Sequence, residues 1–176
     1  MNDPQTDVPR DQRVRILVVE PAHSYCGVLA RRLTEAGYRV TAAQSGASAI
    51  AVLHQVPIDL VLAELNMPPM GGGELARVIR GAVQWRDLPV MLVTGRSDPK
   101  GAVRAYEAGA DDVILKPFHF EVLIARIERR IARLRALEQL AQDKAALDAR
   151  VVERALQIGE LRDRLSLFEG VRARAA

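Results

Sequence analysis

Short, unbroken apolar runs alternate with stretches of helical periodicity between about residues 14 and 117. Runs without polar interruption are typical of strands that are buried on both faces of a parallel sheet. Four such runs are present, at residues 16–19, 60–63, 90–93 and 113–115. Residues 38–41 alternate apolar and polar side chains instead, which predicts an edge strand with one wetter face.

The segments between these runs have the periodicity of amphipathic helices. We expect helices over residues 24–36, 46–55, 72–81 and 99–108. Gly37 and Gly109 stand where the glycine that ends a helix is expected. Gly71, Gly72 and Gly73 are not followed by the Lys-Ser/Thr of a phosphate loop, so we interpret them as a flexible lead into a helix. The alternation of strands and helices predicts a doubly wound α/β domain.

Composition excludes several classes of protein. The chain has 176 residues, 49% hydrophobic and 27% charged, with a formal net charge of +3. A single cysteine, Cys26, excludes a disulfide framework. No apolar run approaches the ~20 residues of a membrane span, and the polar first 13 residues do not resemble a signal peptide. We therefore expect a cytoplasmic protein without a membrane partner.

Most of the residues that follow the predicted strands are polar. Glu20 and Pro21 follow the first run, and Glu64 and Asn66 follow the run at 60–63. Thr94 ends the run at 90–93, and Lys116 ends the last one. Ligands of doubly wound folds bind at the carboxyl ends of the strands, so we expect these groups to converge on one site.

Four stretches in this order, at residues 15–20, 59–68, 88–95 and 109–118, are similar to the receiver domain of bacterial two-component response regulators. The resemblance covers roughly residues 14–130. It implies a five-stranded parallel sheet with the order 2-1-3-4-5, flanked by five helices. It also implies an Asp that accepts a phosphoryl group from a histidine kinase, with Mg²⁺ bound beside it, and a cis bond between Lys116 and Pro117.

The chain departs from the family at the residues that carry this chemistry. Glu64 stands at the phosphoacceptor position, and Pro21 replaces one of two acids of the metal pocket, leaving Glu20. Val113 replaces the switch aromatic. The hydroxyl and the lysine of the family match Thr94 and Lys116.

Mg²⁺ demands near-ideal octahedral coordination, so Glu20, Glu64 and the carbonyl of Asn66 would form at most a residual metal site. We expect no cofactor and no catalytic residue. Glu64 is then a fixed substitute for the phosphoryl group, or one member of an ion pair that only neutralises charge. The alternative is a functional phosphoacceptor response regulator that acts on a missing or separate output domain.

The C-terminal part has the heptad pattern of a coiled coil. From residue 119 to about 170 it contains no Pro and a single Gly before Gly170. Starting the heptad at Leu137, eight of ten a and d positions are apolar over nearly five heptads, the exceptions being Lys144 and Arg154. The predicted dimer seam consists of Leu137, Leu140, Leu147, Val151, Ile158, Leu161, Leu165 and Phe168.

We therefore predict a flexible segment over 1–13, a receiver over 14–125, a coiled-coil helix over 126–170 and a frayed end over 171–176. We expect a homodimer that binds a signalling partner, either a kinase or an output domain. The helix could instead fold back on its own domain. Nucleic-acid binding is disfavoured because residues 119–176 mix 12 basic with 9 acidic side chains.

Overall fold

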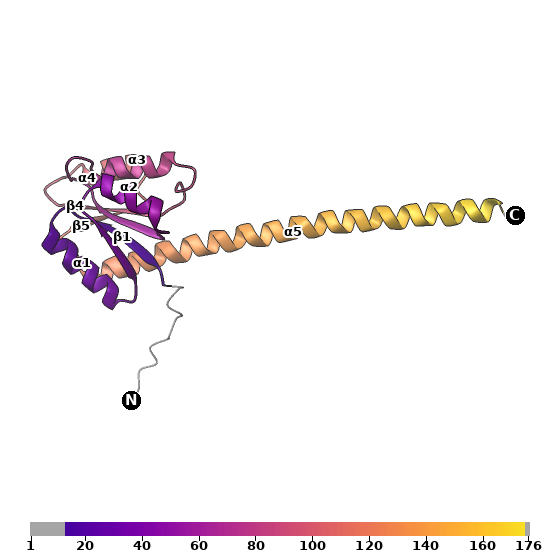
Figure 1. The fold of residues 1–176 in the computed structure, drawn as a ribbon, viewed down its shortest axis with the longest axis horizontal. Coiled ribbons are helices and arrows are strands. Elements are labelled where there is room, and N and C mark those ends of the chain that lie inside the picture. Colours follow the sequence, from indigo (N-terminus) through magenta and orange to yellow (C-terminus); the bar gives the residue numbers. More distant parts are fainter. Residues whose placement is uncertain (1–12, 175–176) are drawn as a thin grey trace, which may run out of the picture. The chain divides into compact units, whose positions relative to one another are not determined.

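The computed structural model describes the backbone of residues 13–174 and the side chains of residues 13–162. Five strands and five helices alternate along the chain (Figure 1). They are β1 (Arg15–Val19), α1 (His23–Glu35), β2 (Arg39–Ala43), α2 (Gly46–Gln55), β3 (Leu60–Glu64), α3 (Gly72–Gly81), β4 (Val90–Gly95), α4 (Gly101–Glu107), β5 (Asp112–Lys116) and α5 (Phe120–Arg174).

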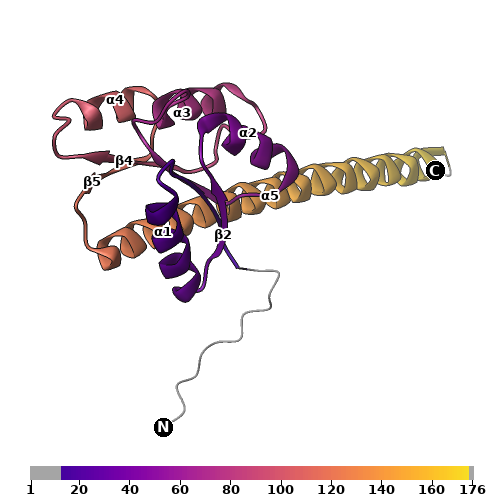
Figure 2. The same ribbon diagram turned by 60° about the vertical axis from the view of Figure 1, so that its left-hand side comes forward.

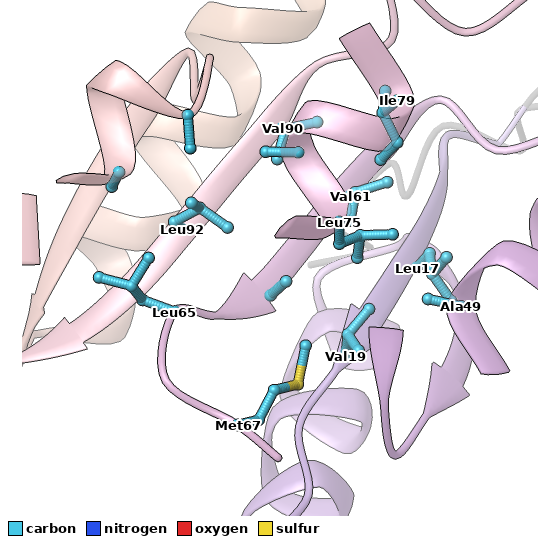
Figure 3. Packing of buried hydrophobic residues seen from close by; sticks show 14 of the residues in the cluster. Leu17, Val19, Ala49, Val61, Leu65, Met67, Leu75, Ile79, Val90 and Leu92 are labelled. Carbon is cyan, nitrogen blue, oxygen red and sulfur yellow. The ribbon is translucent and has the colours of Figure 1, made fainter. Parts of the chain in front are cut away.

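The strands form one parallel sheet with the order β2-β1-β3-β4-β5, which confirms the predicted topology. Because successive side chains of a strand point to opposite faces, each apolar run supplies two cores. Leu17 and Val19 face α2, α3 and α4, whereas Ile16 and Val18 face α1 and the first turns of α5. Figure 2 shows α2, α3 and α4 on one side of the sheet and α1 on the other. Figure 3 shows the core that contains Leu17 and Val19.

The backbone has the glycine conformations and the cis bond that were predicted, but helix α4 differs from its predicted length. Gly37 and Gly109 both have φ of +93°, the left-handed conformation in which glycine avoids the steric cost of a Cβ. The Lys116–Pro117 bond is cis, as the resemblance implied, and Pro68–Pro69 is a second cis bond. Helix α4 is shorter than predicted, because a turn closed by the bond from Gly101 N to Asp98 O precedes it.

Gly71, Gly72 and Gly73 do not form a flexible lead into α3, so this prediction was wrong. Gly71 is the N-cap and α3 begins at Gly72. A Cβ on Gly72 would collide with the carbonyl oxygen of Glu64, and it would lie 2.9 Å from the Leu92 side chain. The glycine is needed because the helix begins directly against the end of β3.

The chain divides into two compact units between Ala132 and Arg133. We placed this boundary at residue 125, but Ile127 and Ile131 of α5 are still buried in the core of the first unit. Helix α5 continues to Arg174, past the predicted end at 170, because residues 171–174 are mostly good helix formers. The predicted flexible segment lies outside the described residues, apart from Arg13. Within the described residues, no helix combines the length and the apolar character that a membrane span requires.

Candidate functional site

The parallel sheet brings the predicted polar residues to one edge. Glu20 directly follows β1, Glu64 is the last residue of β3, and Lys116 is the last residue of β5. Thr94 lies near the end of β4, which pairs with β3 on one side and β5 on the other. Four strands therefore contribute to one cluster, as expected for the carboxyl ends of parallel strands.

The centre of the site is the ammonium group of Lys116, which binds two carboxylates. Lys116 Nζ lies 3.0 Å from Glu20 Oε2 and 2.8 Å from Glu64 Oε2. Both acids are largely buried, with 7% of the Glu20 side chain and 13% of the Glu64 side chain exposed. Glu20 Oε1 also accepts a hydrogen bond from the backbone N–H of Ala22, at 3.0 Å. The cluster thus satisfies its carboxylates from within the protein.

Tyr25 covers the same ammonium group. Its ring, in the first turns of α1, lies with its centroid 4.1 Å from Lys116 Nζ, within the range of a cation–π interaction. Sequence reasoning missed this residue because nothing in the pattern of residues 20–25 shows that the ring turns back over the end of β5. The lysine consequently has two carboxylates and an aromatic face as neighbours.

These contacts change the proton affinity of both side chains. Burial lowers the pKa of Lys116, but hydrogen bonds and charge attraction from Glu64 and Glu20 outweigh it, so the pKa is raised overall. Burial raises the pKa of Tyr25, Glu20 and Glu64 raise it further, and Lys116 opposes the shift. Lys116 is therefore a cation at neutral pH.

Thr94 and Val113 occupy the positions expected of them, but neither contributes a hydrogen bond to the ion cluster among the described residues. Thr94 is fully buried, and its Oγ1 has no hydrogen-bond partner among the described residues. Val113 is buried in the core beneath α4. It has no ring that could move between an inner and an outer position.

The side chain of Asn66 turns away from the two carboxylates. Its Nδ2 donates to Asp98 Oδ2 at 3.0 Å, and its Oδ1 accepts from Arg104 Nη2 at 3.3 Å. Arg104 also donates to Asp98 Oδ2. Asp98 and Arg104 were not predicted as site residues, because they lie in a loop and a short helix that no motif marks.

The residues at this edge do not fit the Mg²⁺ that the family implies. Pro21 is exposed and supplies no side-chain oxygen where an acid would be needed. The two remaining carboxylates already bind an ammonium group, whose positive charge opposes the binding of Mg²⁺ beside it. Across the described part of the chain, no group of three or more His, Cys, Asp or Glu residues could hold a metal ion.

The second unit carries a row of exposed apolar residues on α5. All six seam residues whose side chains are described are more than half exposed; they are Leu137, Leu140, Leu147, Val151, Ile158 and Leu161. Leu165 and Phe168 lie outside the residues with described side chains. Val152 and Leu156 are equally exposed but lie off the predicted seam.

Comparison with known proteins agrees with this architecture. The family model described as "Response regulator receiver domain" matches residues 16–128. The chain is 33% identical over 159 residues to the response regulator MprA of Mycobacterium tuberculosis, covering 89% of this chain and 68% of that protein. It is also 32% identical over 140 residues to the transcriptional regulatory protein KdpE of the same species, covering 80% of this chain and 61% of KdpE.

A third relative, a probable cyclic di-GMP phosphodiesterase of Vibrio cholerae, is 30% identical over 148 residues. The match covers 84% of this chain but one third of that protein (33%). The chain therefore spans only part of the length of some of its relatives.

Solved structures show the same fold. The receiver domain of a signal transduction histidine kinase from Syntrophus aciditrophicus has a TM-score of 0.64 at 35% identity, covering 68% of this chain and 90% of that one. NtrX from Brucella abortus has a TM-score of 0.68 at 26% identity, covering 74% of this chain and 29% of NtrX. By the match to the family model, the similarity to these relatives and its sheet topology, the chain belongs to the receiver-domain family of two-component response regulators.

Proposed function

We propose that this chain is a cytoplasmic signalling module whose receiver works without phosphorylation and which dimerises through α5. The observation that carries the proposal is the position of Lys116 Nζ, bound to Glu20 and Glu64 at 3.0 and 2.8 Å. The carboxylate at the phosphoacceptor position is thereby held in an ion pair by a lysine of the protein itself.

The chemistry of phosphoryl transfer supports this proposal. Transfer of a phosphoryl group to a carboxylate requires that the two groups are well positioned and that the negative charge of the phosphoryl group is neutralised. Phosphoryl-transfer enzymes use a metal ion for this neutralisation. Pro21 removes one metal ligand, and Glu64 carries its carboxylate about one methylene further from the strand than Asp would. A nucleophile that is both displaced and ion-paired is poorly placed for attack.

A functional phosphoacceptor is the second candidate. It is favoured by Thr94, whose buried hydroxyl has no hydrogen-bond partner among the described residues, as expected of a group that awaits a phosphoryl oxygen. Lys116 is present as well. The missing acid at Pro21 and the packed Val113 weigh against this candidate.

The dimer is supported by the exposed apolar residues of the seam. Leu140, Leu147 and Leu161 are each exposed by 57% or more in the single chain. A helix with an apolar stripe in water is stabilised by burying that stripe against another helix. A second copy of the same helix offers a matching stripe. We propose that the dimer presents two receivers to a kinase or an output domain.

Thermal unfolding with and without Mg²⁺ and beryllofluoride, a phosphoryl analogue, tests the receiver. The matched control is Pro21→Asp/Glu64→Asp, which restores both family residues. A ligand at 100 times its Kd stabilises the folded state by about 2.7 kcal/mol. We expect a higher Tm for the variant and no change for the native chain. A shift in the native chain, or a phosphoryl adduct in its intact mass after incubation with acetyl phosphate, would contradict the proposal.

A further inference from the structure

Helix α4 is weakly held by its own packing. It has only seven residues, and its buried residues are Gly101 and Ala105, which bury little apolar surface. Among the described residues, no side chain caps its N-terminus at Lys100. Isolated helices of this length are unstable in water, so the position of α4 depends on contacts that its residues make with the rest of the domain.

Three side chains supply such contacts. Asn66 lies two residues beyond β3, Asp98 lies in the β4–α4 loop, and Arg104 lies in α4. Asp98 Oδ2 accepts from Asn66 Nδ2 at 3.0 Å and from Arg104 Nη2, which also donates to Asn66 Oδ1 at 3.3 Å. Each member touches the other two, so the three form a closed polar triangle.

The triangle adjoins the ion cluster. The backbone N–H of Asn66 points toward Glu64 Oε1, at 3.5 Å. On the other side, the Asp98 carboxylate and the Thr94 hydroxyl both lie against Gly101, where an added Cβ would come within 2.7 Å of each. The first residue of α4 is thus packed directly against the triangle.

We propose that Asp98 and Arg104 are a latch that fastens α4 to the end of β3 and fixes the position of this helix. The latch positions α4 without help from Thr94 or Val113, because Thr94 makes no hydrogen bond to another described residue and Val113 has no aromatic ring that could rotate outward. The inference deepens the proposed function and rests on it in one respect: a receiver that works without phosphorylation needs α4 held by its own residues.

The partial exposure of the latch limits its strength and makes it sensitive to salt. The Asp98 side chain is 21% exposed and that of Arg104 is 51% exposed. Exposed ion pairs are worth little to global stability. The expected effect is therefore local, on α4 and the loop before it, and it weakens as salt screens the charges.

Amide hydrogen exchange on the full chain tests the latch, with Asp98→Ala and Arg104→Met as variants. We expect the amides of α4 to exchange roughly five- to tenfold faster in each variant, which corresponds to the loss of about 1–1.4 kcal/mol of local stability. The amides of β1 and β3 should be unchanged. The double variant should be no faster than the faster single variant, because both substitutions remove one latch.

Lys100→Met is the matched control, since it removes an exposed cation at the start of the same helix without touching the triangle. The latch is refuted if α4 exchange is unchanged in both latch variants, or if Lys100→Met accelerates it equally. It is also refuted if added salt accelerates α4 exchange equally in the native chain and in Arg104→Met. Beryllofluoride binding is measured separately, so a failed latch and a failed proposal for the receiver give different results.

Discussion

The Lys116 ammonium lies 2.8 Å from the Glu64 carboxylate, so the acid at the phosphoacceptor position is paired inside the folded domain. A carboxylate carries one negative charge, whereas a phosphoryl group carries nearly two at neutral pH. Glu64 therefore reproduces only part of the field of a phosphorylated site. The pairing keeps Lys116 oriented toward β3, as a phosphoryl oxygen would.

The first prediction concerns the loss of this cation. Lys116→Met should lower the free energy of unfolding by about 2–4 kcal/mol, because it leaves the two largely buried carboxylates of Glu20 and Glu64 without their partner. Urea denaturation at neutral pH measures the loss. Adding Glu64→Gln to this variant should recover part of it, since one of the unpaired charges is then removed.

Lys100→Met provides the comparison, because Lys100 is exposed and belongs to no ion pair among the described residues. It should change the unfolding free energy by less than about 0.5 kcal/mol. Equal losses for the two lysines would show that the pairing with Glu20 and Glu64 does not stabilise the domain.

The second prediction is a loss of stability at alkaline pH. The pKa of Lys116 is raised above its ordinary 10.5 and that of Tyr25 above its ordinary 10.0, so the folded state retains protons that the unfolded chain releases. Their contribution is fully present below about pH 10 and is lost as pH rises through the folded-state values. Urea midpoints between about pH 8 and 11 should fall most steeply above pH 10.

Tyr25→Phe keeps the ring over Lys116 but removes the phenol. Its urea midpoint should therefore fall less steeply with pH than that of the native chain. A native midpoint that stays constant above pH 10 would contradict the assignment.

The third prediction concerns the contact between α3 and β3. Gly72→Ala should destabilise the domain by about 1–3 kcal/mol, because its Cβ would collide with the Glu64 carbonyl oxygen. Gly81→Ala, at the other end of the same helix, has open space around the new Cβ. It should be neutral or stabilising by up to ~1 kcal/mol, as expected from helix propensity. Thermal unfolding of both variants is the measurement, and similar Tm values for the two would refute the close approach.

The fourth prediction separates the seam from the rest of α5. Leu147→Glu places a charge at a d position and should convert the proposed dimer to a monomer, as measured by sedimentation equilibrium. Leu156→Glu is its control, because Leu156 is similarly exposed, at 65% against 61%, but lies at an f position. Dissociation by both variants, or by neither, would exclude the predicted seam as the dimer interface.

The sequence was a good guide to the sheet and to the groups at its end. Apolar runs are set by burial on both faces, and parallel strands end at the same edge, so Glu20, Glu64 and Lys116 could be brought together by topology alone. The positive φ of Gly37 and Gly109 follows from local backbone chemistry in the same way.

Contacts that depend on the direction of a side chain could not be predicted. Tyr25 turns over Lys116 and Asn66 turns away from Glu64, and both depend on rotamers chosen by the surrounding packing. The glycines at the start of α3 gave a misleading signal for a similar reason. Glycine is compatible with a flexible loop and with a tight contact, and only the position of β3 distinguishes them.

The pairing of Lys116 also bears on its chemical reactivity. Only the free amine of a lysine attacks an acylating reagent, and a lysine held as a cation by two carboxylates offers little free amine. The chain has three lysines, and the other two, Lys100 and Lys144, are exposed. An N-hydroxysuccinimide ester should therefore label these two and spare Lys116, which makes peptide mapping of the label a direct report on whether the ion cluster is closed.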